Sequence, residues 1–421
     1  MSGTRSSGWS VPVQTVASPG GIRAWLIEDH SVPVVSLSFS FRGGAALDPE
    51  GREGRASLAA ALLDQGAGEL DTAGFATALR DRAVSLSFGA GRDELTGSLR
   101  CLAEETGFAA SMLALALTRP RFDAEALARV KAQRLIALRR KAEEPRTIAS
   151  RAWWERAVAP HPFARPPGGT EAALGQLGRD DLLAALEVQV RRGALVVGAA
   201  GAIDAAGLGR MLDEAFGGVA EGVAPEVPPL PAPRAFGLAI TERAVPQAVA
   251  VFGHGGPDPD DPDWEAFQVV NWILGGGGFS SRLTEEIREK RGLTYGIGTQ
   301  LAPFRGRSLI LGSVSTENAR FGETLALLKA EWARMAEAGP TAEEVAAARA
   351  YLTGSFPLGF TSSGQIAGTL ASLQTLGRPP EWLAGRIGRI EAVTLADARR
   401  AAARLYDPAA LSISVVSRPG I

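Results

Sequence analysis

The chain has 421 residues, a formal net charge of −2 and a single cysteine, Cys101. At this length we expect more than one domain, and a hydrophobic content of 46% allows sizeable cores. The near-neutral charge, with no strongly basic stretch, argues against nucleic acid as the main partner. One cysteine excludes an internal disulfide and a thiolate zinc cluster.

No segment of the sequence is typical of membrane insertion or export. The longest apolar stretches, such as residues 194–203, are shorter than the roughly 20 residues that a bilayer requires. Residues 1–14 contain no apolar run of the kind found in a signal peptide. We therefore expect a cytoplasmic protein without membrane contact, or a periplasmic one if a signal peptide has been removed.

The first half of the chain opens with strand and helix patterns. Residues 32–44 (VPVVSLSFSFRGG) alternate apolar and small polar side chains and end in glycines, which predicts a strand. Apolar helices are predicted next at 56–66 and 75–84, followed by strands at 84–93 and 94–102. A helix at 108–117, a long helix at 124–142 with an apolar stripe, and a strand at 194–200 complete this half.

A proline-rich stretch at 221–236 predicts a semi-rigid linker, because its prolines remove backbone donors and favour extended geometry. After it the same order of elements recurs with an offset of about 210 residues, which indicates an internal duplication. The matching segments are 246–256, 266–276, 282–292, 293–302, 308–316, 321–330 and 411–417.

This duplication predicts an α+β fold with two homologous domains, each a mainly antiparallel sheet covered by helices on one face. We place the first domain at residues 1–220, the linker at 221–236 and the second domain at 237–421.

Two stretches resemble signatures of a known family. Residues 281–298 (SRLTEEIREKRGLTYGIG) are similar to the second-domain signature of the pitrilysin (insulinase) family of zinc peptidases, the inverzincins. Residues 161–169 (HPFARPPGG) resemble the first-domain pattern of that family. The paired halves and their linker are similar as well, so the resemblance spans nearly the whole chain and implies peptides as ligands.

The zinc motif of that family is missing. Members that cleave peptides carry H-x-x-E-H on the first helix of domain one, where two imidazoles bind zinc and the glutamate activates water. The corresponding positions here are Ser57, Ala60 and Ala61. A further glutamate, roughly 75 residues on, completes the family's ligands, and no residue from 126 to 141 is acidic. We expect no metal and no other cofactor in this chain.

The histidines offer no substitute for the motif, because His30, His161 and His254 are too far apart in sequence to share a helix. We expect His30 in a solvated turn, His161 to order its loop and His254 to be a turn residue at the end of a strand. Cys101 lies in an apolar run and is expected in the core. The run LGGGGFSSR at 274–282 lacks the G-K-[ST] of a phosphate loop, so nucleotide binding has no support.

The segment 279–298 predicts a short charged helix that ends at Gly292 and leads into a strand. A solvated, salt-bridged helix explains these features without any function, and that interpretation stays open. The family resemblance implies more, because Arg288 and Tyr295 match the pair that contacts peptide opposite the zinc. A guanidinium and a phenol can donate hydrogen bonds to a carbonyl oxygen that gains negative charge.

The glycine-rich run before this helix resembles a segment of the family's non-zinc subunits. The resemblance implies that Gly276, Gly277, Phe279 and Arg282 bind the peptide substrate. The alternative, equally open, is a flexible turn before a capped helix.

The presence of Arg288 and Tyr295 without a zinc motif suggests that two chains together form one active site. We expect the zinc-free subunit of a heterodimeric metallopeptidase, inactive alone, with the zinc in a homologous partner that carries H-x-x-E-H. The alternative is a non-catalytic scaffold or peptide-binding protein of the same family, like the core subunits of respiratory complexes.

Overall fold

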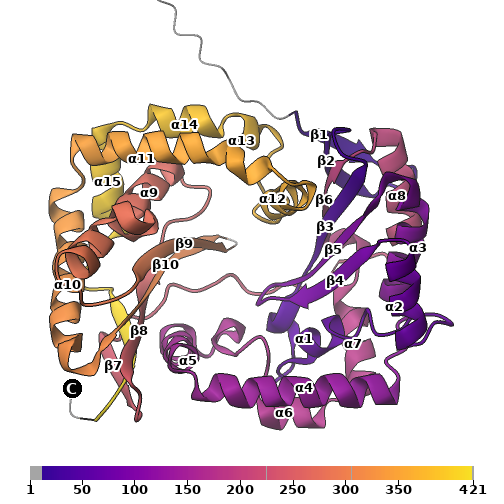
Figure 1. The fold of residues 1–421 in the computed structure, drawn as a ribbon, viewed down its shortest axis with the longest axis horizontal. Helices are drawn as coiled ribbons and strands as arrows, with labels where there is room; N and C mark the ends of the chain where they lie inside the picture. The colour runs from indigo at the N-terminus through magenta and orange to yellow at the C-terminus, as the bar shows by residue number, and fades with distance from the viewer. Residues whose placement is uncertain (1–11, 224, 305, 420–421) are drawn as a thin grey trace, which may run out of the picture. The chain divides into compact units, whose positions relative to one another are not determined.

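The computed structural model describes residues 12–223, 225–304 and 306–419, which form two compact units (Figure 1). Unit 1 comprises residues up to 136 together with 166–227 and 356–386, and unit 2 comprises 137–165, 228–355 and the residues from 387 on. Each unit is therefore assembled from separate stretches of chain. The N-terminal residues that bear on the signal-peptide expectation lie mostly outside the described part.

Unit 1 contains a mixed sheet with the strand order β1-β2-β6-β3-β5-β4. The strands are β1 (Gln14–Ala17), β2 (Arg23–Glu28), β3 (Val34–Arg42), β4 (Ser85–Ala90), β5 (Glu94–Leu102) and β6 (Leu195–Gly201). Only the β2–β6 pair among these is parallel. The predicted strand at 32–44 is β3, the centre of the sheet, and Cys101 on β5 is buried as expected.

The alternation in β3 separates two faces of the sheet. Leu37, Phe39 and Phe41 are buried on one face, where Phe39 packs edge-on against Phe216 of α8 with ring centroids 5.2 Å apart. The serines between them point to the other face. One face therefore carries the main apolar core of unit 1, and the second face needs a cover suited to small polar side chains.

The helices of unit 1 surround this sheet, with α3 and α8 packed against each other (Figure 1). They are α1 (Arg55–Ala60), α2 (Thr72–Asp81), α3 (Thr106–Thr118), α6 (Glu171–Gln176), α7 (Arg179–Gln189), α8 (Ala205–Phe216), α12 (Ser363–Thr375) and α13 (Glu381–Ala384). Helix α4 (Ala124–Glu143) begins in unit 1 and ends in unit 2.

Unit 2 contains a sheet with the order β7-β11-β8-β10-β9. The strands are β7 (Leu238–Glu242), β8 (Gln247–Gly255), β9 (Ile297–Phe304), β10 (Arg307–Glu317) and β11 (Ser412–Ser417). Its one parallel pair among the described strands is β7–β11. This order and these directions repeat those of β2-β6-β3-β5-β4 strand for strand, as the duplication predicts.

The helices of unit 2 are α5 (Pro145–Val158), α9 (Trp264–Asn271), α10 (Phe321–Ala338), α11 (Ala342–Ser355), α14 (Arg386–Ala392) and α15 (Leu395–Leu405). The two mainly antiparallel, helix-covered sheets confirm the predicted α+β class. No helix in the described ranges is both long and apolar enough to cross a membrane.

Two helices are exchanged between the halves of the chain. Helix α12 belongs to the second half in sequence, yet it packs on β6 and β3 of unit 1. Helix α5 belongs to the first half, yet it packs on β11 and β8 of unit 2. The compact units thus combine stretches from both halves of the chain, whereas the predicted segments 1–220 and 237–421 are continuous.

The serine face of β3 receives α12. The Ser36 hydroxyl lies 2.9 Å from that of Ser363, and the Gln374 amide donates to the Val197 carbonyl at 2.8 Å. The close approach depends on Gly198 in β6, where an added Cβ would lie 2.2 Å from the Ala367 carbonyl oxygen. Backbone-to-backbone packing therefore joins this helix to the sheet.

Replacing Gly198 by alanine tests the close approach. We expect Gly198→Ala to destabilise the protein by about 1–3 kcal/mol, because the helix must move off the sheet to make room. Urea unfolding followed by circular dichroism measures the change. Gly368→Ala is the matched control within α12, since nothing lies within 4 Å of its added Cβ, and alanine should there stabilise the helix by about 0.5–1 kcal/mol. Equal midpoints for the two variants would contradict this packing.

The described residues of the predicted linker form no helix or strand. Its second part is nevertheless anchored within unit 2. Leu230 is buried, and Arg234 donates from its backbone to Ala157 at 2.8 Å and from its side chain to Ala159 at 2.6 Å. His161 contacts the Pro228 carbonyl at 3.0 Å and accepts from the Phe163 amide at 3.2 Å, so it orders this loop as predicted.

Candidate functional site

The predicted site residues lie on one continuous stretch of unit 2 between α9 and β9. After α9, the chain forms a π-helical turn (Trp272–Gly276), a 3₁₀ turn (Gly278–Ser280) and a helix whose last part, Thr284–Glu289, is also π-helical. Such wide turns are rare and frequently found at functional sites. The predicted helix is therefore present, but its winding differs from the α-helix that the sequence pattern suggests.

The glycines of this stretch permit close packing around Trp272. A Cβ on Gly277 would lie 2.8 Å from the Trp272 carbonyl oxygen and about as close to its indole ring. The Trp272 ring in turn contacts the Tyr351 ring, with centroids 5.2 Å apart. Gly276 is exposed beside this packing. The predicted contact of Gly276 and Gly277 with substrate stays a prediction, and local packing alone already requires Gly277.

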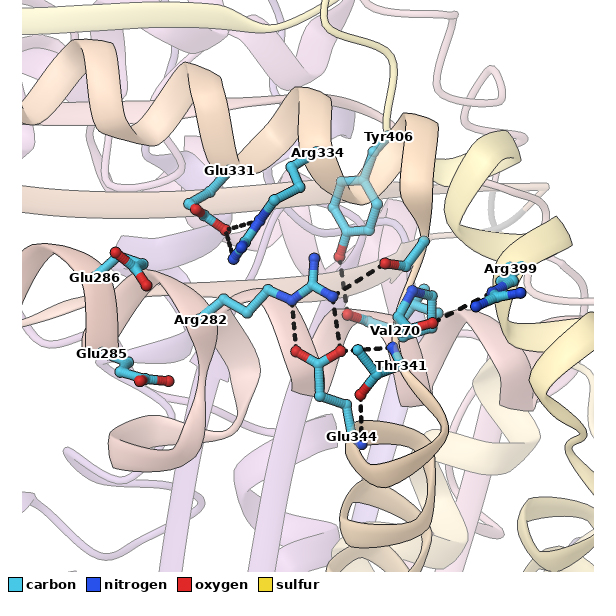
Figure 2. Close-up of polar contacts among 12 residues, drawn as sticks. Val270, Arg282, Glu285, Glu286, Glu331, Arg334, Thr341, Glu344, Arg399 and Tyr406 are labelled. Carbon is cyan, nitrogen blue, oxygen red and sulfur yellow. Dashed lines mark hydrogen bonds and ion pairs between the residues drawn. The ribbon is translucent and has the colours of Figure 1, made fainter.

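Arg282 begins the helix and is buried, with 8% of its surface exposed. Its guanidinium forms two hydrogen bonds to the Glu344 carboxylate, at 2.6 and 2.7 Å, and a third to the Gly339 carbonyl at 3.0 Å (Figure 2). Arg282 therefore ties the helix to the start of α11. Its predicted role in substrate binding stays a prediction, since its contacts are internal.

Glu344 serves two purposes in this network. It accepts from the Thr341 amide at 2.7 Å while its own amide donates to the Thr341 hydroxyl at 3.2 Å, a capping box for α11. Burial alone would raise the pKa of Glu344, but hydrogen bonds from Arg282 and Thr341 outweigh it and lower the pKa. Burial alone would lower the pKa of Arg282. The hydrogen bonds and charge of Glu344 outweigh burial and raise the pKa of Arg282 above its ordinary value.

Breaking this ion pair should destabilise the fold. Glu344→Gln leaves the Arg282 cation buried without a carboxylate, and we expect a loss of about 2–4 kcal/mol, since Glu344 retains some exposure. The stabilisation is fully present above the unfolded-state pKa of Glu344, near 4.5, and is lost as pH falls through its lowered folded-state pKa. Unfolding curves at several pH values measure both effects.

The neighbouring exposed Glu343 supplies the control for this experiment. Glu343→Gln should change stability little at any pH, because a solvated carboxylate contributes little. If the Glu344 and Glu343 variants unfold alike, the pair does not anchor the helix.

Arg288 lies on the last π-helical turn and is half-buried. Its guanidinium carbon is 4.4 Å from the centroid of the Phe279 ring, and its Nε lies 3.5 Å from a Glu289 carboxylate oxygen. Phe279 itself is 70% exposed. The cation–π contact holds Arg288 against the exposed Phe279 ring at the surface.

Tyr295 follows the helix at the tip of a tight turn and is 86% exposed. Gly292 ends the helix with φ +58°, as predicted. The Thr294 hydroxyl donates to the Ser315 carbonyl at 2.6 Å and accepts from the Gly296 amide at 3.0 Å, which fixes the turn. Within the described residues no hydrogen bond or ring contact joins Tyr295 to Arg288, so the structure positions each separately on this segment.

The helix that carries zinc ligands in the family is α1, and its residues do not fit a metal. All of its side chains are buried, and the ligand positions are occupied by Ser57, Ala60 and Ala61. The Ser57 hydroxyl accepts a hydrogen bond from Arg134 of α4 at 2.9 Å. A guanidinium thus lies against the first of these positions. The described residues contain no group of three or more His, Cys, Asp or Glu side chains that could hold a metal ion.

Metal analysis tests this assignment directly. Protein purified from zinc-supplemented culture should hold well under one zinc per chain, because one hydroxyl and two methyl groups cannot replace the thiolate, imidazole and carboxylate ligands that zinc requires. Chelation should leave the thermal midpoint unchanged. One tightly bound zinc per chain, detected by mass spectrometry of the metal content, would contradict it.

His254 differs from its predicted place in a turn. It lies inside β8 and is buried. Its Nδ1 lies 2.7 Å from the Gly255 carbonyl and its Nε2 accepts from the Trp332 indole at 3.3 Å, so both ring nitrogens have partners in the core. Burial lowers the pKa of His254. It is a core residue in an aromatic cluster with Trp332 and Tyr406. His30 is exposed beside Glu28, as predicted.

Comparison with known proteins agrees with these observations. Residues 176–352 match the family model described as the peptidase M16 inactive domain. The chain is 28% identical over 369 residues to the non-peptidase homolog YmxG of Helicobacter pylori, which covers 87% of this chain and 85% of that protein.

Solved structures show the same fold along the chain. The crystal structure of a peptidase M16 inactive domain from Pseudomonas fluorescens superposes with a TM-score of 0.91 and 26% identity, over 97% of this chain and 98% of that one. A chain of complex III2 from Candida albicans matches with a TM-score of 0.79 and 16% identity, over 96% of both chains.

These matches agree with the resemblance of the sequence to the pitrilysin-type family, since residues 176–352 match the peptidase M16 inactive domain and the fold of a solved member extends along the chain. The match is to an inactive domain, and the positions of the zinc motif hold Ser57, Ala60 and Ala61.

Proposed function

We propose that this chain is the zinc-free subunit of a two-chain peptidase and contacts the peptide substrate through Arg288 and Tyr295. The homologous partner would supply H-x-x-E-H and the zinc. The observation that carries the proposal is the exposure of Phe279 and Tyr295, with Arg288 half-buried against Phe279, on a segment that buried contacts hold in place. Exposed hydrophobic surface often marks an interaction site, which supports a ligand at this segment.

The chemistry of these side chains suits a peptide backbone. The Tyr295 hydroxyl has no hydrogen-bond partner among the described residues, so it is free to donate to a carbonyl oxygen. The Phe279 ring stacks on one face of the Arg288 guanidinium. The N–H groups at the edge of that guanidinium can therefore still donate hydrogen bonds. Both donors would stabilise a carbonyl oxygen as negative charge develops on it during attack by zinc-bound water of the partner.

A second candidate is a non-catalytic scaffold. The likeness to a chain of complex III2 supports it at the level of fold alone. In that case Phe279 and Tyr295 would be buried by a permanent partner protein, as aromatic residues often are at interfaces, and neither hydroxyl nor guanidinium would affect a reaction.

Tyrosine and arginine variants in the assembled heterodimer distinguish the two candidates. With the H-x-x-E-H homologue of the same genome as partner, Tyr295→Phe or Arg288→Ala should lower kcat for an unstructured peptide about 10²–10³-fold if the donor acts on the oxyanion. A donor that binds only ground-state substrate would raise KM with little change in kcat. Partner zinc and heterodimer mass should stay as in wild type.

Tyr351→Phe is the matched control, because Tyr351 is also exposed and keeps its ring contact with Trp272 when the hydroxyl is removed. It should leave turnover unchanged. Normal kcat and KM for Tyr295→Phe would refute the role of Tyr295. Loss of dimerisation in Arg288→Ala without any kinetic effect of Tyr295→Phe would favour the scaffold.

A further inference from the structure

The short helix α1 is fixed in unit 1 independently of any metal. The Asp48 carboxylate accepts from the backbone amides of Gly54 and Ala56, at 2.9 and 3.0 Å, and so caps the start of the helix. Asp48 also lies 3.8 Å from the Nε of Arg55. Because these contacts hold the helix, Ser57 on its first turn has a defined position.

Arg134 of α4 reaches this position from 77 residues further along the chain, where its guanidinium donates to the Ser57 hydroxyl at 2.9 Å. The sequence offered one signal of this contact. The family places a glutamate ligand on this helix, and the corresponding stretch here has arginine and no acidic residue.

Arg134 is half-buried without a carboxylate partner in the described part of the chain. Arg121 of the same unit, by contrast, has a carboxylate partner in Asp123 at 2.7 Å. Burial lowers the pKa of Arg134, which reports that its charge is poorly solvated. A guanidinium nevertheless stays protonated in proteins. Because burial removes part of its hydration, this cation gains when an anionic group binds to it.

We propose that Arg134, oriented by Ser57, binds a carboxylate of a peptide ligand at the position where zinc-binding members of the family hold their metal. Its Nε and second Nη have no partner among the described residues, and the guanidinium fork matches a carboxylate with two parallel hydrogen bonds. The proposal rests on the proposed function only in taking a peptide as the ligand. The carboxylate can be the C-terminus or an acidic side chain.

Binding of labelled peptides to the full chain, followed by fluorescence anisotropy, tests the proposal. One short unstructured peptide with neutral side chains is compared in three forms: with a free C-terminus, with an amidated C-terminus, and amidated with one internal glutamate. At least one carboxylate-bearing form should bind about 10–100-fold more tightly than the neutral form. Which form does so identifies the source of the carboxylate.

Arg134→Gln should abolish this preference, whereas Arg134→Lys should retain part of it. Ser57→Ala should weaken it by a smaller factor, since the guanidinium loses only its orienting acceptor. Arg129→Gln is the matched control on the same helix, because Arg129 is exposed and bonds to Gln65. It should leave the preference intact. Circular dichroism and thermal midpoints verify that each variant is folded.

Equal binding of the three peptide forms to wild type, or an unchanged preference in Arg134→Gln, would overturn the proposal. Absence of any binding would overturn it too. None of these results bears on the kinetic effects of Tyr295→Phe in the heterodimer, so the proposed function is judged separately.

Discussion

The close contact between α12 and β6 is the constraint on which the architecture of unit 1 depends. Gly198 lets the backbone of the helix approach the strand, and the Ser36–Ser363 and Gln374–Val197 contacts satisfy the polar groups there. Without this helix the serine face of β3 would be open to water. In unit 2, α5 has the corresponding role, with the Trp153 indole donating to the Ser412 carbonyl at 3.2 Å. Each sheet is completed by the other half of the chain.

Features encoded within short stretches could be predicted from the sequence. The alternation in 32–44 and 246–256 identified the central strands, and the repeated order of elements identified the duplication. The positive φ of Gly292 followed from its place after a charged helix. The absence of the zinc motif was evident, because it requires specific side chains at fixed spacing.

The rest depends on contacts between segments distant in sequence. The apolar residues of α12 show that it is partly buried, but nothing in them specifies the sheet that it covers. Arg282 was assigned to substrate on the family resemblance, and its ion pair with Glu344, 62 residues away, was not foreseen. The pairing could have been suspected from the T-x-x-E pattern at 341–344, which marks a helix start. His254 was misplaced because neighbouring glycines suggested a turn, whereas the indole of Trp332 keeps it in the core.

The segment from 276 to 298 contains both an internal anchoring residue and exposed aromatic residues. Arg282 is internal and holds the helix (Figure 2). Phe279, before it in sequence, and Tyr295, after it, are exposed. The attraction within a buried ion pair offsets the loss of hydration only when the hydrogen-bond geometry is good. The network around Glu344 therefore also restricts how far the helix can move. Precise placement of a donor is what transition-state stabilisation requires, so the internal role of Arg282 supports the proposed role of Arg288.

The zinc-motif helix α1 carries Ser57 in place of a ligand, with the Arg134 guanidinium of α4 beside it, and this has a definite chemical consequence. Zinc and a guanidinium both attract oxygen lone pairs, so a carboxylate or carbonyl that suits one also suits the other. Zinc additionally lowers the pKa of bound water and generates hydroxide. A guanidinium only donates hydrogen bonds and does not coordinate water, so it cannot do so. Ser57 and Arg134 can therefore retain a preference for oxygen ligands after the capacity for hydrolysis is lost, which is the combination expected of a chain that holds peptides without cutting them.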